Sequence, residues 1–508
     1  MRQLTAPDTV RLSARLRRWS SAASTSPSPL FKLTRDFCGL LQNNRCRCSH
    51  PSMNGCEGQQ EERHSAVSEL RSAVAALAAD APEFSSGIIR LEVPIKQRSE
   101  AVAWLHAQQT LPRVFFSGRG GWEADEDAAE ERRSEGGSNL VSVAGVGSAV
   151  YFRRFEPFSF EDWKCIRRFL SKDCPFIRAY GALRFDATTK ISSEWKTLVE
   201  FNELEESSKL AINIAWDDNL RWPWEKAMDG LLNTMDQISP SASSLQRQVP
   251  RSTVLSSSHT PSKAYWDVCI NKALQMIKGE NSDLLKVVLA RSSRILTSAE
   301  INPITLLACL QMEGQKAYQF CIQPAGGPAF IGNTVTISQE DLQVWSEALA
   351  GTRARGRTVR DDLKIRQDLL LSRKDDVEFS IIICDEVRVE SSKTIRKLPR
   401  VQHLCARLSG RLKREEDEFY VLTHLHPTPA VCGLPTEEAR RFIAENEAFD
   451  RGMYAGPVGW FGGRETEFAV GIRSALVGRG QPLRGEPDRV RSANALAGAL
   501  PLYQQPKV

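Results

Sequence analysis

Two charged residues lie inside apolar stretches, where a charge is unusual. Lys286 stands in "LLKVVLAR" and Glu347 in "SEALAGTRARG". Burial disfavours the charged form of each group, which lowers the pKa of a lysine and raises the pKa of a carboxyl group. Together they would supply a general base and a general acid. The residues alone leave an alternative open, since a lysine on an edge strand and a glutamate before a turn can both reach solvent.

Arg473 lies in "EFAVGIRSALV", which alternates like a β-strand. Strand periodicity would place Arg473 on one face with Ala469, Gly471 and Ala475. Such small neighbours leave room above the strand, and the two parallel donors of an arginine suit a carboxylate. An ordinary salt bridge is the alternative.

His426 and Glu378 carry weaker signals. His426 begins "HPTPAVCGLP", whose prolines favour a rigid, extended loop. A single histidine is more often structural than catalytic. Glu378 lies in "KDDVEFSI", which reads as the start of a helix. Mg²⁺ uses one or two carboxylates together with water and substrate oxygens, but for Glu378 taken alone the residues favour a solvated helix face.

The overall composition is that of a soluble globular protein. The chain has 508 residues, 41% hydrophobic and 25% charged, with no apolar run long enough to span a bilayer. The net charge of +5 is small for this size and indicates neither a nucleic-acid nor a membrane partner. Twelve cysteines are scattered without regular pairing, which is typical of free thiols in a reducing compartment.

The first 60 residues differ from the rest. They are rich in Arg and Ser, and up to residue 48 the only acids are Asp8 and Asp36. This composition predicts an organelle transit peptide, with a disordered tail as the alternative. The cluster Cys46, Cys48 and His50 lacks the usual C-x2-C spacing of a zinc site, so we expect no metal there.

The remaining pattern mixes helices and strands. Helical periodicity is clear in 263–279, 361–372 and 437–449, and strands are expected at 284–296, 316–323 and 467–477. Several strands adjoin without a crossover helix, which favours large antiparallel sheets in an α+β fold. We expect an N-terminal part at 61–238, a Ser/Pro-rich linker or loop at 239–262, a catalytic part at 263–477 and a divergent tail at 478–508.

Several motifs in this order resemble one family. "KVVLARSS", "FIGNT", "SEALAGTRARG", "KDDVEF", "LHPTPAVCG", "AFDRGMYAGPVGWF" and "FAVGIRSALV" are similar to those of the chorismate-utilising enzymes, and among these to the plant-type isochorismate synthases. The resemblance covers roughly residues 90–477. It implies one large domain in which two antiparallel β-sheets face each other with helices outside. It also implies the Mg²⁺-dependent conversion of chorismate to isochorismate.

The resemblance assigns roles to individual residues. Lys286 would activate the water that attacks ring carbon 2, and Glu347 would protonate the 4-hydroxyl as it leaves. Glu378 would be a Mg²⁺ ligand. The substrate site would be lined by Gly351, Thr352, His426, Ala430 and Arg473.

The pair Lys286 and Ala350 separates this chain from related chemistries. Aminodeoxychorismate synthases resemble it but carry lysine where Ala350 stands, and anthranilate synthases typically have glutamine where Lys286 stands. Salicylate synthases share the pair and go on to eliminate pyruvate, so they stay an alternative. The plant-like first half favours a monomeric enzyme of the chloroplast stroma, feeding phylloquinone, menaquinone or salicylate synthesis.

The last segment departs from the family pattern. After "FAVGIRSALV" the family continues into an A-G-(A/T)-G-I strand and an S-x-x-x-E-W-x-E helix that supplies the second Mg²⁺ ligand. Here the chain reads "GRGQPLRGEPDRVRSANALAGALPLYQQPKV". Two consequences are expected: reduced or absent activity in this chain, or a non-catalytic homologue that keeps the fold.

Overall fold

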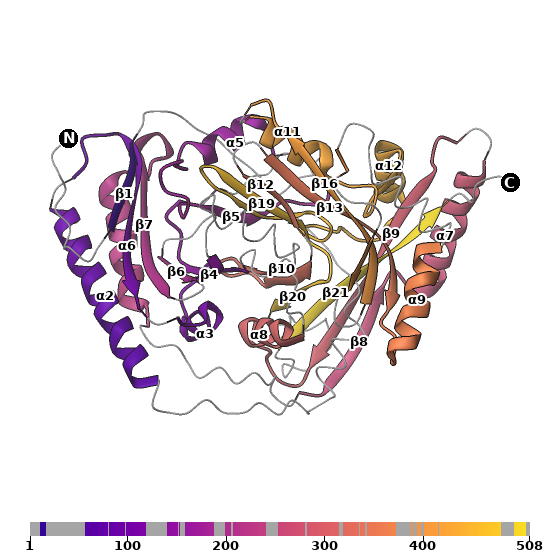
Figure 1. The fold of residues 1–508 in the computed structure, drawn as a ribbon, viewed down its shortest axis with the longest axis horizontal. Helices are drawn as coiled ribbons and strands as arrows, with labels where there is room; N and C mark the ends of the chain where they lie inside the picture. Colours follow the sequence, from indigo (N-terminus) through magenta and orange to yellow (C-terminus); the bar gives the residue numbers. More distant parts are fainter. Residues whose placement is uncertain are drawn as a thin grey trace, which may run out of the picture.

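The computed structural model contains two antiparallel β-sheets (Figure 1). It describes residues 11–16, 56–79, 81–96, 98–117, 140–150, 152, 158–186, 199–204, 207–239, 252–279, 282–313, 318–334, 336–340, 343–371, 388–389, 394–397, 401–414, 416–478 and 492–503. Within these residues, no helix is both long and apolar enough to cross a membrane.

The larger sheet draws its strands from both halves of the chain. Its order is β1-β2-β7-β6-β4-β3-β10-β11-β20-β21-β9-β17, and β8 also pairs with β9. The bounds are β1 Arg11–Leu16, β2 Ser86–Ile95, β3 Arg113–Ser117, β4 Leu140–Val146, β6 Val199–Leu204, β7 Ser208–Asp217, β8 Val254–Thr260, β9 Lys286–Thr297, β10 Tyr318–Gln323, β11 Ala329–Thr334, β17 Gly433–Leu434, β20 Ser474–Gly478 and β21 Ser492–Tyr503. The predicted boundary at 239–262 therefore does not separate two independent sheets.

The smaller sheet has the order β14-β16-β13-β12-β19-β18-β5, with β15 also paired to β16. The bounds are β5 Ala179–Ala182, β12 Thr336–Glu340, β13 Gln343–Ala354, β14 Arg388–Val389, β15 Thr394–Lys397, β16 Val401–Arg411, β18 Pro457–Phe461 and β19 Glu465–Val470. β5 comes from the first half of the chain and pairs with β18 from the second. Both sheets are thus shared between the two halves.

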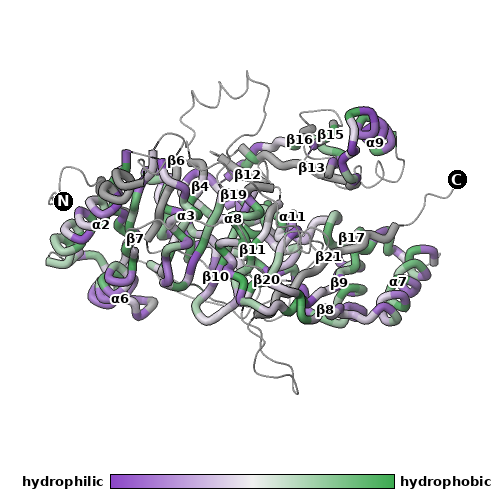
Figure 2. The backbone as a smooth tube through the Cα atoms, turned by 90° about the horizontal axis from the view of Figure 1, so that it is seen from below, coloured by the Kyte–Doolittle hydropathy of each residue, from purple (hydrophilic) through white to green (hydrophobic). Residues whose placement is uncertain are grey.

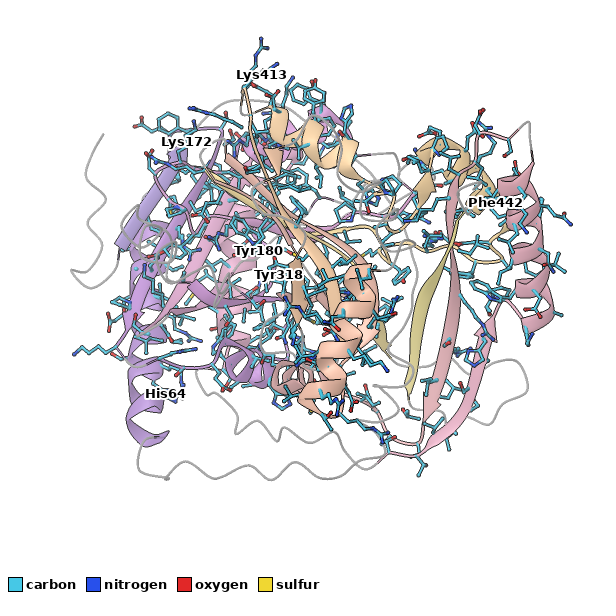
Figure 3. All side chains as sticks on the ribbon, turned by 45° about the vertical axis from the view of Figure 1, so that its right-hand side comes forward. His64, Lys172, Tyr180, Tyr318, Lys413 and Phe442 are labelled. Carbon is cyan, nitrogen blue, oxygen red and sulfur yellow. The ribbon has the colours of Figure 1, made fainter. Side chains whose placement is uncertain are left out.

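A layer of buried side chains joins the two sheets. Phe116 of β3 stacks on Tyr180 of β5, with ring centroids 5.3 Å apart, and also contacts Tyr318 of β10. Tyr180 and Tyr318 are both labelled near the middle of the molecule in Figure 3. The same cluster includes Phe320 and Trp460, again one from each sheet. The expected arrangement of two facing antiparallel sheets is confirmed.

Helices cover the outer surfaces. Their bounds are α2 Cys56–Ala78, α3 Ala101–Ala107, α5 Phe160–Arg167, α6 Trp224–Gln237, α7 Lys263–Lys278, α8 Pro303–Glu313, α9 Val359–Leu371, α11 Asp417–Leu425 and α12 Thr436–Asn446. α2 and α6 pack on β7, α12 and α7 on β9, and α9 on β13 and β16. Hydrophobic segments gather around β11 and β20, whereas α6 and α9 are largely hydrophilic (Figure 2).

Two segments differ from the sequence-based expectation. Residues 11–16, inside the predicted transit region, form β1 and pair with β2. Residues 254–260, inside the predicted linker, form β8 and pair with β9. All seven residues of β8 are exposed. An edge strand whose residues are all exposed shows no hydrophobic alternation, so periodicity could not reveal it.

The expected strand 467–477 is in fact two strands in different sheets. β19 ends at Val470 in the smaller sheet, and β20 begins at Ser474 in the larger one. Arg473 lies between them with a positive φ of 51°. The prediction that Arg473 shares a strand face with its small neighbours is therefore wrong. The alternation of large and small residues continues through the break in the sequence, which hides the change of sheet.

Candidate active site

Lys286 is the first residue of β9 and is 0% exposed. Its backbone stands opposite Leu434 of β17 on one side and Tyr503 of β21 on the other. Next to it, Leu285 N donates to Leu434 O at 2.8 Å and Val288 N donates to Cys432 O at 2.7 Å. The lysine is thus buried inside the sheet, as the apolar stretch around it predicts, and does not reach solvent from an edge.

The loop from His426 to Cys432 runs directly into β17. His426 Nε2 lies 3.0 Å from Arg184 O and 2.9 Å from Phe185 O, so it donates to these two carbonyls. Burial lowers the pKa of His426 to about 4, against the opposing effect of the two hydrogen bonds, so the ring is neutral near pH 7. Ala430 is partly buried in the same loop. His426 therefore ties this loop to the residues that follow β5.

Arg473 is held at the crossing from the smaller sheet to the larger sheet. Its Nη2 lies 2.8 Å from His403 Nε2. A guanidinium has only donors, so His403 Nε2 accepts, and the ring is neutral with its proton on Nδ1. His403 lies on β16 and is 3% exposed. The contact fixes one side of the guanidinium and the tautomer of the histidine.

Within the smaller sheet, the strand that carries His403 pairs with the strand that carries the predicted substrate residues Gly351 and Thr352. His403 pairs with Thr352 of β13, and Ala350 pairs with Leu404, so Gly351 is an extra residue in the ladder. Such a β-bulge locally bends the strand and often lies beside an active site. The sheet thus brings the predicted residues Gly351 and Thr352 to His403, and His403 to Arg473. Sequence reasoning missed His403, although a histidine inside the apolar strand "HLCA" is the same kind of signal as Lys286.

Glu347 is described through its backbone position. It lies on β13 opposite Arg407 of β16, four residues before the bulge at Gly351. The predicted acid and the predicted base therefore belong to different sheets, β13 in the smaller and β9 in the larger. Ala430, His426 and Lys286 are connected through β17, whereas Glu347, Gly351, Thr352 and Arg473 are connected through β13 and β16.

The described residues test the predicted Mg²⁺ site only in part. Glu378 lies outside the residues that the structure describes. Within the described ranges, no group of three or more His, Cys, Asp or Glu side chains could hold a metal ion. The described residues therefore do not by themselves form a metal centre.

A family model described as "Chorismate binding enzyme" matches residues 141–482. "Isochorismate synthase 2, chloroplastic" of Arabidopsis thaliana is 51% identical over 469 residues, covering 84% of this chain and 83% of that protein. "Isochorismate synthase, chloroplastic" of Catharanthus roseus is 46% identical over 483 residues, with the same coverage of 84% and 83%.

Two solved structures share the fold. MenF, the menaquinone-specific isochorismate synthase from Escherichia coli, has a TM-score of 0.70 at 21% identity, covering 87% of this chain and 94% of that one. Anthranilate synthase component I from Streptococcus pneumoniae has a TM-score of 0.51 at 17% identity, covering 67% of this chain and 80% of that one. At these identities the likeness concerns the arrangement of sheets and helices.

Proposed function

Because the chain belongs to the family of chorismate-binding enzymes, we propose that it is an isochorismate synthase, an isomerase that converts chorismate to isochorismate. The observation that carries the proposal is the buried Lys286 at the start of β9, in a chain 51% identical to a protein of that name. A lysine without access to bulk water is suited to act as a neutral base.

The proposed reaction exchanges one hydroxyl for another. Lys286 takes a proton from a water molecule as its oxygen bonds to ring carbon 2. The ring double bonds shift, and the 4-hydroxyl leaves as water with a proton from Glu347. One water enters and one leaves, so the step is an isomerisation. Ala350, in place of a lysine, offers no competing amine at this position.

Arg473 is the proposed partner of a substrate carboxylate. Its contact with His403 holds the guanidinium at the crossing between the sheets, where it can form two parallel hydrogen bonds to an anion. The bulge at Gly351 frees backbone groups of β13 from the ladder, and these support the same substrate together with Thr352. Ala430 and His426 belong to the proposed opposite wall.

We further propose Mg²⁺ as the cofactor, with Glu378 as one ligand. When bound, Mg²⁺ would neutralise negative charge on the substrate. The names of the two plant relatives favour the chloroplast, and we propose the stroma, a transit peptide within residues 1–60 and a monomeric enzyme. The product would supply phylloquinone, menaquinone or salicylate synthesis.

The test is a chorismate assay on the full chain, with Mg²⁺ or with EDTA, and chromatography that resolves isochorismate, salicylate and anthranilate. We expect isochorismate alone, formed slowly because of the atypical last segment and only when Mg²⁺ is present, and none from Lys286→Met. Salicylate together with pyruvate would assign the chain to the salicylate synthases. No product from folded protein would instead support a non-catalytic homologue.

A further inference from the structure

One edge of β9, the strand that begins with Lys286, is paired by two separate strands with a gap between them. β17 pairs with Lys286 and Val287, and β8 pairs with β9 from Ser292 onward. Among the described residues, no strand pairs with this edge at Val288–Arg291. Buried backbone groups at such a gap need partners, because an unmade hydrogen bond away from water is costly.

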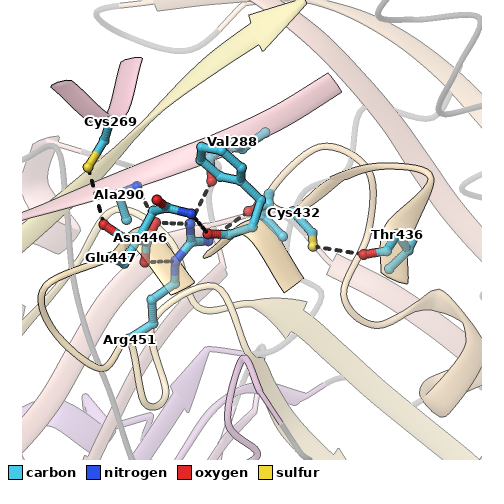
Figure 4. A network of polar contacts seen from close by, with 10 residues as sticks. Cys269, Val288, Ala290, Cys432, Thr436, Asn446, Glu447 and Arg451 are labelled. Atoms are coloured by element: carbon cyan, nitrogen blue, oxygen red, sulfur yellow. Dashed lines mark hydrogen bonds and ion pairs between the residues drawn. The ribbon is translucent and has the colours of Figure 1, made fainter. Parts of the chain in front are cut away.

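The gap is filled by the side chains of Glu447 and Arg451 (Figure 4). Glu447 Oε1 accepts from Ala290 N at 2.7 Å, and Arg451 Nη2 donates to Val288 O at 2.6 Å. A carboxylate thus takes the place of a strand carbonyl, and a guanidinium takes the place of a strand N–H. Between the stretch of β9 paired with β17 and the stretch paired with β8, Ala290 N and Val288 O therefore both have hydrogen-bond partners.

The same pair also holds the loop that carries Ala430. Arg451 Nη1 donates to Val431 O at 2.8 Å, and Arg451 Nε donates to Glu447 Oε2 at 2.8 Å. The side chains of Arg451 and Glu447 are only 2% and 5% exposed. The guanidinium also lies over the ring of Phe185, 4.1 Å from its centroid. One arginine therefore connects β9, the 426–434 loop and the segment after β5.

The position of Glu447 is itself fixed. It follows α12 directly, and the preceding Asn446 accepts hydrogen bonds from two residues of α7. Cys269 Sγ donates to Asn446 O at 3.2 Å (Figure 4). Lys272 Nζ donates to Asn446 Oδ1 at 2.8 Å. A buried ion pair adds little net stability compared with apolar side chains of similar size. An apolar pair could not form the hydrogen bonds that Glu447 and Arg451 make to the backbone of β9.

We propose that Glu447 and Arg451 are positioning residues, which hold Lys286 in its reactive place by completing the edge of β9. The proposal rests on the proposed function, since it assigns the pair to the base of that reaction. Val288 is two residues from Lys286, a strand distance of about 7 Å. A shift of about 1 Å at a reacting group can lower the rate about 100-fold.

The test uses three variants of the full chain. Arg451→Lys keeps the charge but has one nitrogen for three acceptors, and Glu447→Gln keeps an oxygen for Ala290 N but removes the ion pair. The matched control is Arg441→Lys, which changes an exposed ion pair between Arg441 and Glu438, both on α12. Steady-state kinetics across pH and hydrogen–deuterium exchange of peptides spanning 284–292 are measured for each.

We expect Arg451→Lys to lower kcat about 10- to 100-fold with a smaller change in KM, and Glu447→Gln to act in the same direction. Water reaching Lys286 favours its charged form, so the rising limb of kcat/KM against pH should move to higher pH. Amide exchange in 284–292 should accelerate in both variants and not in the control.

Folded variants with unchanged kcat, pH profile and exchange would overturn the proposal. Slower catalysis in proportion to lost folded protein, with an unchanged pH profile, would overturn it too, because that is a purely structural effect. If Arg451→Lys does not fold, Glu447→Gln decides alone. Absence of isochorismate from the unaltered chain would instead refute the proposed function, and the exchange experiment would still report on the strand edge.

Discussion

Gly433 is the position where a single methyl group would disturb Lys286 most directly. Gly433 has a φ of +150° and pairs with Val287, next to Lys286. A Cβ at Gly433 would lie 2.2 Å from Lys286 O and 2.5 Å from the Cβ of Ala439. Both are far inside van der Waals contact. Gly433→Ala must therefore push β17 away from the first turn of α12, from β9, or from both.

The expected cost has two parts. A non-glycine residue forced into this backbone region costs about 1–3 kcal/mol, and overpacking a buried contact costs a further 1–3 kcal/mol, roughly. The clashes are with the backbone of β9 and with the Cβ of Ala439, and no side-chain rotation moves either of them. The sum predicts a loss of about 2–6 kcal/mol in the free energy of unfolding. Lys286 should shift as well, so kcat should fall by more than the folded fraction does.

Two other glycines separate the contributions. Gly326 has a φ of +72°, and a Cβ at this position would meet nothing within 4 Å, so Gly326→Ala tests backbone strain alone. Gly410, on β16, has open space and no positive φ, so Gly410→Ala should be close to neutral. Urea unfolding and kcat are measured for all three. If Gly433→Ala unfolds no more easily than Gly326→Ala and retains full kcat, the steric reasoning is refuted.

Three further predictions concern single side chains. Arg473→Lys loses the paired donors, and KM for chorismate should rise about 10- to 100-fold; an unchanged KM would exclude the carboxylate contact. Burial lowers the pKa of His426 to about 4 in the folded protein, so between about pH 4 and 6.5 the unfolded chain binds more protons than the folded one. The free energy of unfolding should therefore fall by up to about 3 kcal/mol as the pH drops from about 6.5 to about 4. In urea unfolding, His426→Gln should lose this pH dependence, and a variant that keeps it would contradict the assignment. Asp362 accepts from Arg355 and Lys397, which hold the pKa of its carboxyl well below the usual range. Asp362→Asn should speed amide exchange in α9, and identical exchange would show that these contacts do not hold the helix.

The fold was largely accessible from the sequence because most elements bury one face. Helices at 263–278 and 436–446 show clear periodicity. β8 was not accessible, because all its residues are exposed and it is held by backbone pairing and a contact between the polar side chains of His259 and Ser293. The two-sheet arrangement was predicted only through the family resemblance, since strand order is a long-range property that local patterns do not contain.

The candidate site was accessible in part for the same reason. A charged residue within an apolar run stands out, so Lys286 could be identified and its burial anticipated. The environment of Arg473 could not be predicted, because the residue pattern alternates without interruption where the chain passes from β19 to β20. His403 was missed because its meaning depends on Arg473, 70 positions away in the chain. In the sequence, Glu447 and Arg451 are spaced like an ordinary ion pair at a helix end. Their role depends on contacts with β9, which is distant in the chain.

The place of β21 in the larger sheet has a consequence for how the protein is made. β21 lies between β20 and β9 and pairs with β9 along its whole length, from Lys286 to Thr297. The two strands are separated by roughly 200 residues, which at 5–20 residues per second takes the ribosome about 10–40 s to translate. During that interval the backbone N–H and C=O groups along this edge of β9 lack their partners in β21. Such an edge is a target for wrong strand pairing, so molecular chaperones should have their largest effect on yield during synthesis of the second half.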